Sequence, residues 1–227
     1  MQSSFRVLCH THGVPPSTSI KAVIFDVGGV LTSPLRETFE KIQAGGAVDL
    51  SKVGPQFRDT FMVGHDGDLP SHRLERGEIS MNDFVATLGE ARDAVWTLMH
   101  PDSPHSLFSH VTPHDGMHRL VDDARNAGYK TGIVSNIFTE YIPRWDEITN
   151  HVGRFDSVVY SCSVGVRKPN RAIFDIALAE LDIEAHEALF IDDTPDMVSA
   201  ARNYGFVSVE VDNHDSAIAE ARRILAI

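Results

Sequence analysis

The chain has 227 residues, enough for one large domain or for one domain with a sizeable insertion. Apolar residues make up 42% of it, which is enough to bury a core and argues against general disorder. The formal net charge is −12, and this excess of acids disfavours nucleic acid and anionic membranes as partners. A small anionic substrate would need local cations or a metal at its site.

The chain contains two cysteines, too few for a disulfide framework. Because no apolar run reaches membrane-spanning length either, the sequence predicts a cytoplasmic protein without a membrane partner. Residues 1–19 are expected to form a flexible N-terminal tail. A transit peptide is the alternative, because residues 1–25 lack acids, but Arg6 and Lys21 are their only lysine or arginine residues.

The first predicted element is the strand KAVIFDV at 21–27, whose aspartate precedes two glycines. Residues 34–112 then show a mainly helical pattern, and Ser80 is the expected N-cap of the longest helix. Helices are expected there at 35–43, 56–63 and 80–99. Loop composition is found at 64–78 and 100–116.

Strands and helices alternate regularly after residue 113. Strands are predicted at 129–136, 155–161, 187–193 and 206–211. Helices are predicted at 114–128, 138–148 with a break at Pro143, 169–182, 195–205 and in the last residues. Such alternation indicates a parallel sheet in an α/β fold.

Polar groups stand at the carboxyl ends of three predicted strands. They are Asp26 after the first strand, Ser135 and Asn136 after the second, and Asp192 and Asp193 after the fourth. Lys168 follows the third strand and precedes a helix. Because open α/β sheets bind ligands at the carboxyl ends of their strands, these side chains are expected to converge.

Four segments resemble the successive motifs of the haloacid dehalogenase-like (HAD) hydrolase superfamily, in the family order: FDVGGVL, IVSN, VRKP and FIDDTPDMVSAARNYG. The match covers about residues 20–212, and RLERGEISMNDF resembles the cap of the phosphatase-like domain at the amino terminus of soluble epoxide hydrolases. The resemblance implies a Rossmannoid core with a parallel sheet and a helical cap inserted after the first strand. The implied division is a tail at 1–19, a catalytic core at 20–33 and 113–227, and a cap at 34–112.

The same resemblance gives roles to the acids. Asp26 would be the nucleophile that attacks phosphorus and forms an aspartyl-phosphate. Mg²⁺ would be held by Asp26, the backbone carbonyl of Gly28 and Asp193. Asp192 is expected to support the metal site less directly, since adjacent acids on a strand point to opposite faces.

The other motif residues would contact the substrate. Ser135 and Asn136 would hold phosphoryl oxygens, and Lys168 would supply positive charge to the nucleophile and to the developing phosphorane. The alternatives are strand-end capping for Ser135 and Asn136 and a solvated surface position for Lys168.

Gly28 departs from the family pattern. The usual first motif is Asp-x-Asp, whose second acid protonates the leaving group and later activates water, and such acid–base help is worth about 10²–10⁴-fold. Family members with a non-acid there include dehalogenases and some phosphatases. Histidines of the insertion, His65 and His72 first, are candidates to replace the acid, with an ordinary surface or core role as the alternative.

The sequence therefore predicts a Mg²⁺-dependent hydrolase of phosphoric monoesters that acts on a small phosphorylated metabolite, as a monomer or homodimer. One alternative is a metal-independent 2-haloacid dehalogenase-type enzyme, which would attack carbon. Another is a HAD-fold binding module with weakened catalysis. The paired acids Asp192 and Asp193, together with Lys168, favour metal-assisted phosphoryl chemistry.

Overall fold

The computed structural model describes residues 19–46 and 65–227. Residues 1–18 of the predicted tail and the predicted helix at 56–63 lie outside the described residues. Within them, five parallel strands form one sheet in the order β3-β2-β1-β4-β5. The strands are β1 (Ala22–Phe25), β2 (Lys130–Ser135), β3 (Ser157–Tyr160), β4 (Ala188–Asp192) and β5 (Val207–Glu210). The predicted strands and their parallel arrangement are confirmed.

Strand β1 lies at the centre of the sheet. Phe25 is paired with Ile133 of β2 on one side and with Ile191 of β4 on the other. All four residues of β1 are fully buried, as expected for a strand whose two faces are both covered. The residue that follows β1 is therefore placed in the middle of the carboxyl edge of the sheet.

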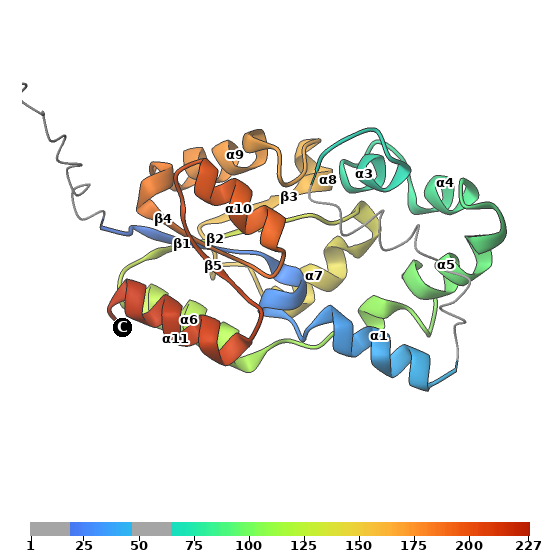
Figure 1. The fold of residues 1–227 in the computed structure, drawn as a ribbon, viewed down its shortest axis with the longest axis horizontal. Coiled ribbons are helices and arrows are strands. Elements are labelled where there is room, and N and C mark those ends of the chain that lie inside the picture. The colour runs from blue at the N-terminus through green and yellow to red at the C-terminus, as the bar shows by residue number, and fades with distance from the viewer. Residues whose placement is uncertain (1–18, 47–64) are drawn as a thin grey trace, which may run out of the picture.

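Helices cover both faces of the sheet (Figure 1). One face is covered by α9 (Arg171–Leu181) and α10 (Pro195–Asn203), the other by α6 (Asp115–Asn126) and α11 (His214–Leu225). The side chains of β1 alternate between the two resulting cores, with Ile24 in one and Phe25 in the other. Among the described residues, no helix has both the length and the apolar character needed to cross a bilayer.

The segment between β1 and β2 carries its own helices, which gather beyond the end of the sheet where β1 stops (Figure 1). They are α1 (Leu35–Ala44), α3 (Pro70–Glu75), α4 (Met81–Ala86) and α5 (Arg92–Met99), with short 3₁₀ turns at Gly89–Ala91 and Leu107–Ser109. This helical insertion is compatible with the expected cap. The domain boundaries given above stay a prediction.

The predicted single helix at 80–99 is wrong. Ser80 does begin α4, because its hydroxyl accepts a hydrogen bond from the backbone N–H of Asp83 in a capping box. Gly89, in the left-handed conformation with φ +55°, then separates α4 from α5. The apolar pattern continues across this break because both helices pack against the same core.

The predicted loop at 64–78 is also wrong in part, because it contains α3. Pro70 occupies the first turn of this short helix, where a proline is tolerated, and Leu74 is buried. The predicted helix at 138–148 with a break is a 3₁₀ turn at Thr139–Tyr141 followed by α7 (Ile142–Thr149), and Pro143 lies in the first turn of α7. A further short helix, α8 (Ser161–Val164), directly follows β3 and was not predicted.

The insertion is held against the core by direct contacts. Ser161 donates its hydroxyl hydrogen to the backbone carbonyl of Glu75 at 2.6 Å, and the N–H of Met81 donates to Glu140 Oε1 at 2.8 Å. Gly77 has φ +70°, and a Cβ there would lie 2.6 Å from the carbonyl oxygen of Cys162. The backbones of insertion and core therefore touch at Gly77.

Substitution of Gly77 should weaken this contact. Gly77→Ala should lose about 1–2 kcal/mol for the left-handed conformation and about 1–3 kcal/mol more for the clash with Cys162. Gly89→Ala is the matched control, because it has the same backbone strain but no atom within 4 Å of the added Cβ. Urea denaturation of both variants measures the difference, and equal losses would show that the Gly77 contact contributes nothing.

Candidate active site

Three carboxylates converge at the carboxyl edge of the sheet. Asp26 follows β1, Asp192 ends β4, and Asp193 comes next. One oxygen from each lies within 4.8 Å of the other two. Because β1 and β4 are neighbours in register, the residues that follow them emerge side by side. Asp193 lies beyond the strand, so the alternation expected to separate it from Asp192 does not apply.

Lys168 joins two of these acids. Its ammonium group donates to Asp26 Oδ1 at 2.8 Å and to Asp192 Oδ2 at 2.6 Å, and the residue is only 3% exposed. Burial acts to lower the pKa of Lys168, but the charges of Asp192 and Asp26 outweigh it and raise the pKa above its ordinary value. Lys168 is therefore a buried, charged group of the site and not a solvated surface lysine.

Asn136 fixes the backbone of Lys168. Its Oδ1 accepts from the N–H of Lys168 at 2.8 Å, and its Nδ2 donates to the carbonyl of Lys168 at 3.1 Å. Ser135 is buried beside it, and its hydroxyl oxygen accepts from Nε1 of Trp145 at 3.3 Å. Both residues thus lie at the carboxyl end of β2, as expected. Their contacts with phosphoryl oxygens stay a prediction.

The two adjacent acids differ in their partners. Asp192 is fully buried, with one oxygen on Lys168 and the other accepting from the N–H of Thr194 at 2.8 Å. Within the described part of the chain, Asp193 accepts a hydrogen bond only from the Thr194 hydroxyl, at 3.3 Å. Burial, together with the charges of Asp26 and Asp192, raises the pKa of Asp193 to about 7. Asp193 is therefore the acid that a bound cation would stabilise most.

The two glycines after Asp26 differ in backbone conformation. Gly29 has φ +73°, and a Cβ there would lie 2.0 Å from Asp193 Oδ2, so no side chain fits. Gly28 has φ −66° and ψ 125°, angles that any residue adopts. Gly29 is therefore required both by its conformation and by the close approach of Asp193.

Sequence reasoning missed an ion pair between the insertion and the core. Arg167 precedes Lys168 and is 1% exposed, and its Nε donates to Glu75 Oε2 of α3 at 2.6 Å. Its NH1 group also donates to the carbonyl of His65 at 2.8 Å. The only signals in the sequence were the RLERGE and VRKP segments themselves. Nothing in them shows that they meet.

The candidate histidines of the insertion, His72 and His65, differ in burial. His72 is fully buried, and burial and the charge of Arg167 lower its pKa to about 4. It is therefore a neutral imidazole near pH 7 and lacks the extra proton that an imidazolium could donate. His65 is exposed, with its backbone carbonyl rather than its ring held by Arg167.

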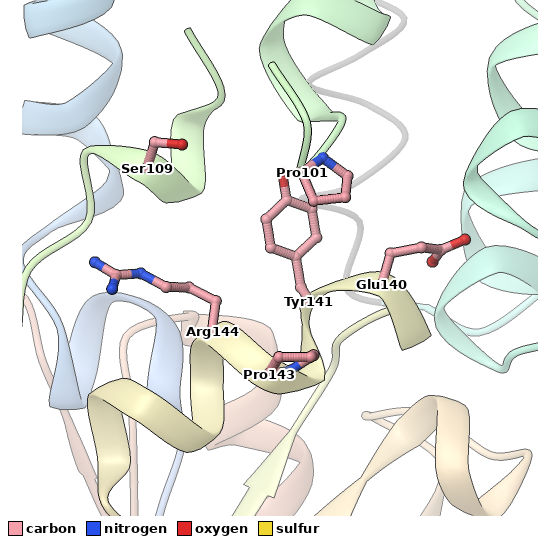
Figure 2. Close-up of a pocket in the computed structure, with 6 residues that line it drawn as sticks. All are labelled: Pro101, Ser109, Glu140, Tyr141, Pro143 and Arg144. Carbon is pink, nitrogen blue, oxygen red and sulfur yellow. The ribbon is translucent and has the colours of Figure 1, made fainter. Parts of the chain in front are cut away.

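A separate hollow of about 340 Å³ lies where the insertion meets the start of α7 (Figure 2). It is lined by Pro101, Ser109, Glu140, Tyr141, Pro143 and Arg144. The Tyr141 hydroxyl, beside the hollow, donates to the carbonyl of Met99 and contacts Ser106. None of the predicted site residues lines this hollow, so it belongs to the joint between insertion and core.

The model of the haloacid dehalogenase-like hydrolase family matches residues 20–205, and the chain belongs to this family. The resemblance found in the motifs and the expected α/β fold are thereby confirmed, and the protein is a hydrolase by family.

Several curated proteins are similar to the chain. Acyl-CoA dehydrogenase family member 10 of Mus musculus is 28% identical over 218 residues, which are 91% of this chain and 19% of that protein. Bifunctional epoxide hydrolase 2 of Mus musculus is 24% identical over 223 residues, 91% of this chain and 39% of that protein. Sesquiterpene phosphatase astK of Aspergillus oryzae is 26% identical over 215 residues, 92% of this chain and 98% of that protein. The chain thus spans less than half the length of the first two.

Solved structures show the same fold. A HAD-like family hydrolase from Porphyromonas gingivalis is 23% identical with a TM-score of 0.58, over 92% of this chain and 98% of that chain. A HAD family enzyme from Bacteroides thetaiotaomicron, in complex with magnesium and inorganic phosphate, is 20% identical with a TM-score of 0.55, over 85% of this chain and 94% of that chain.

The raised pKa of Asp193 has a consequence for stability. Because the folded protein holds this proton up to about pH 7 and the unfolded chain releases it near pH 4, the free energy of unfolding should fall as pH rises between these values. Asp193→Asn should remove that loss, worth about 1.4 kcal/mol per pKa unit, and stabilise the metal-free protein at pH 8.

Urea denaturation in EDTA at pH 5 and pH 8 measures this effect. Asp212→Asn, at an exposed acid, serves as the matched control and should leave the pH dependence unchanged. An Asp193→Asn variant that is no more stable than the wild type at pH 8 would contradict the assignment.

Proposed function

We propose that the chain is a Mg²⁺-dependent phosphatase that hydrolyses a small phosphorylated metabolite through an aspartyl-phosphate on Asp26. The observation that carries the proposal is the convergence of the carboxylates of Asp26, Asp192 and Asp193, with the ammonium group of Lys168 in contact with the first two. The similarity to a phosphatase that the chain spans almost completely supports phosphoester hydrolysis over other reactions of the family.

The donor set fits magnesium. Three carboxylates offer oxygens within 4.8 Å of one another, and hard oxygen ligands are those that Mg²⁺ prefers. In this proposal Asp26, Asp193 and the carbonyl of Gly28 hold the ion, while both oxygens of Asp192 are occupied by Lys168 and Thr194. Bound Mg²⁺ would offset the negative charge of the phosphoryl oxygens. The crystallised relative with magnesium and phosphate supports this choice of ion.

The chain's own residues then carry the reaction. Lys168 holds one oxygen of the Asp26 carboxylate, and the other oxygen attacks phosphorus while the alkoxide leaves. The positive charge of Lys168 also stabilises the charge that develops on the phosphoryl group. Asn136 keeps Lys168 in place through its two backbone contacts. Water then hydrolyses the acyl phosphate and restores Asp26.

The charge of the cluster favours this reaction over dehalogenation. A dehalogenase attacks carbon and needs one aspartate and no metal, whereas here three carboxylates lie close together with one lysine among the groups that contact them. Like charges at this distance disfavour ionisation unless a cation is present. The ion pair between Asp26 and Lys168 likewise disfavours a binding module with weakened catalysis.

Phosphate release should depend on the metal. With a nitrophenyl phosphate, the purified protein should release phosphate in Mg²⁺ and lose this activity in excess EDTA, and fresh Mg²⁺ should restore it. Calorimetric titration should show Mg²⁺ binding that Asp193→Asn abolishes. Equal activity with and without EDTA, or unchanged Mg²⁺ affinity in the variant, would overturn the metal assignment.

Asp26 should be the residue that carries the phosphoryl group. Asp26→Asn should lower the turnover number by on the order of 10⁵–10⁶, the scale known for loss of a covalent nucleophile. Beryllium fluoride, which mimics an aspartyl-phosphate, should be found on Asp26 in a crystal of the wild-type protein. An adduct on another residue, or near-normal activity of the variant, would rule this mechanism out.

A further inference from the structure

The proposed reaction needs a proton carrier that the core does not supply. The departing alkoxide must gain a proton, and the water that attacks the aspartyl-phosphate must lose one. Gly28 has no side chain for either step. Asp192 cannot easily serve, because Lys168 and Thr194 hold both of its oxygens.

Glu75 reaches the site from the insertion. It is the last residue of α3, and its backbone carbonyl accepts from the hydroxyl of Ser161, which follows β3. Its carboxylate accepts from Nε of Arg167, the residue directly before Lys168. Two contacts, one through the backbone and one through the side chain, thus fix Glu75 at the carboxyl edge of the sheet.

The Glu75 carboxyl group is only partly used by its partner. Oε2 is held by Arg167, and no described residue forms a hydrogen bond with Oε1. The residue is 6% exposed, and it lies close enough to Lys168 and Asp26 to interact with their charges. Burial and the charge of Asp26 raise the pKa of Glu75, opposed by Arg167 and Lys168, so that the net shift is upward. Such a carboxyl group exchanges protons closer to neutral pH than an ordinary glutamate.

Two histidines near the site are poorer proton carriers. His72 is neutral near pH 7, as described above. His214 packs against the loop after Asp26 and stacks on His114 with ring centroids 3.9 Å apart. Burial and the neighbouring imidazole lower the pKa of His214, so it too is uncharged there. Among the described residues of the insertion, Glu75 is a buried carboxylic acid that pairs with Arg167, the neighbour of Lys168.

We propose that Glu75 is the acid and base of this enzyme and takes the part that the missing carboxylate at position 28 would play. The inference rests on the proposed phosphatase function. In the first step the bond between phosphorus and the leaving oxygen breaks, and that oxygen takes the proton of the Glu75 carboxyl group. In the second step water attacks the phosphorus of the aspartyl-phosphate, the bond between phosphorus and the Asp26 oxygen breaks, and the water gives a proton back to the Glu75 carboxylate. Inorganic phosphate leaves and the Asp26 carboxylate is restored.

This role changes the expected dependence on the leaving group. Without a side chain that donates a proton, turnover would depend steeply on the pKa of the leaving group, because an alkoxide would depart unprotonated. With Glu75 as the acid, the wild-type enzyme should turn over alkyl phosphates nearly as well as aryl phosphates. Glu75→Gln should restore the steep dependence and lower alkyl-phosphate turnover by about 10²–10⁴-fold, with a much smaller loss for nitrophenyl phosphate.

The experiment measures turnover of an alkyl and a nitrophenyl phosphate, pre-steady-state phenol release and the pH profile in Mg²⁺. Glu75→Gln keeps an acceptor for Arg167 and should show a burst of nitrophenol, because hydrolysis of the aspartyl-phosphate has lost its base. The limb of the pH profile that arises from ionisation of Glu75 should disappear. The charges of Arg167, Lys168 and Asp26 act on the pKa behind this limb. Glu78→Gln is the matched control, since Glu78 is exposed and, among the residues that the structure describes, pairs with Arg73 and Arg76 alone.

The outcomes separate a chemical role from a structural one. Equal losses for both substrates in Glu75→Gln, without a burst and with a lower denaturation temperature, would show that Glu75 only holds the insertion and would overturn the proposal. Glu75→Asp, which keeps a carboxyl group, should recover part of the alkyl-phosphate turnover. A wild-type protein that hydrolyses neither substrate would overturn the phosphatase function itself, whereas an active wild type with an unaffected Glu75→Gln would overturn only the role of Glu75.

Discussion

The site depends on one buried ammonium group that lies between two carboxylates. Lys168 contacts Asp26 and Asp192, while Asp193 adds a third negative charge nearby. Without the lysine these acids would repel one another in a buried environment, where unpaired charge is strongly destabilising. The strand order supplies the acids, and the two contacts from Asn136 to the Lys168 backbone supply the cation at the right place.

Two successive residues form ion pairs with different parts of the chain, one with the core and one with the insertion. Lys168 is turned toward the acids of the core, and Arg167 toward Glu75 of α3. Both pairs are buried, and removing one member of such a pair typically costs about 3–5 kcal/mol. Movement of the insertion away from the core would break the Arg167–Glu75 pair next to Lys168. The position of the insertion and the geometry of the site are therefore linked through a single peptide unit.

The sheet and the core of the site were predictable because they follow local rules. Apolar strands ending in Asp26 and Asp192 form parallel neighbours, so their carboxyl ends meet. The remaining features depend on contacts between distant segments. Helix α3 is six residues long and gives no clear periodic pattern, and Glu75 acquires its environment only from Arg167, far along the chain. The close approach of Asp193 to Gly29 could not be predicted either, because it joins segments far apart in the sequence.

The central position of β1 also has a consequence for how the chain reaches this structure. β1 is the first strand to be synthesised, but Ala22 pairs with Lys130 and with Ala188, which are made much later. Pairings between such distant residues slow folding, because the intervening chain must be ordered before they form. During translation the apolar segment AVIF therefore stays unpaired until both neighbouring strands have been synthesised. Until Ala188–Asp192 has been synthesised, β1 lacks one of the two strands that pair with it.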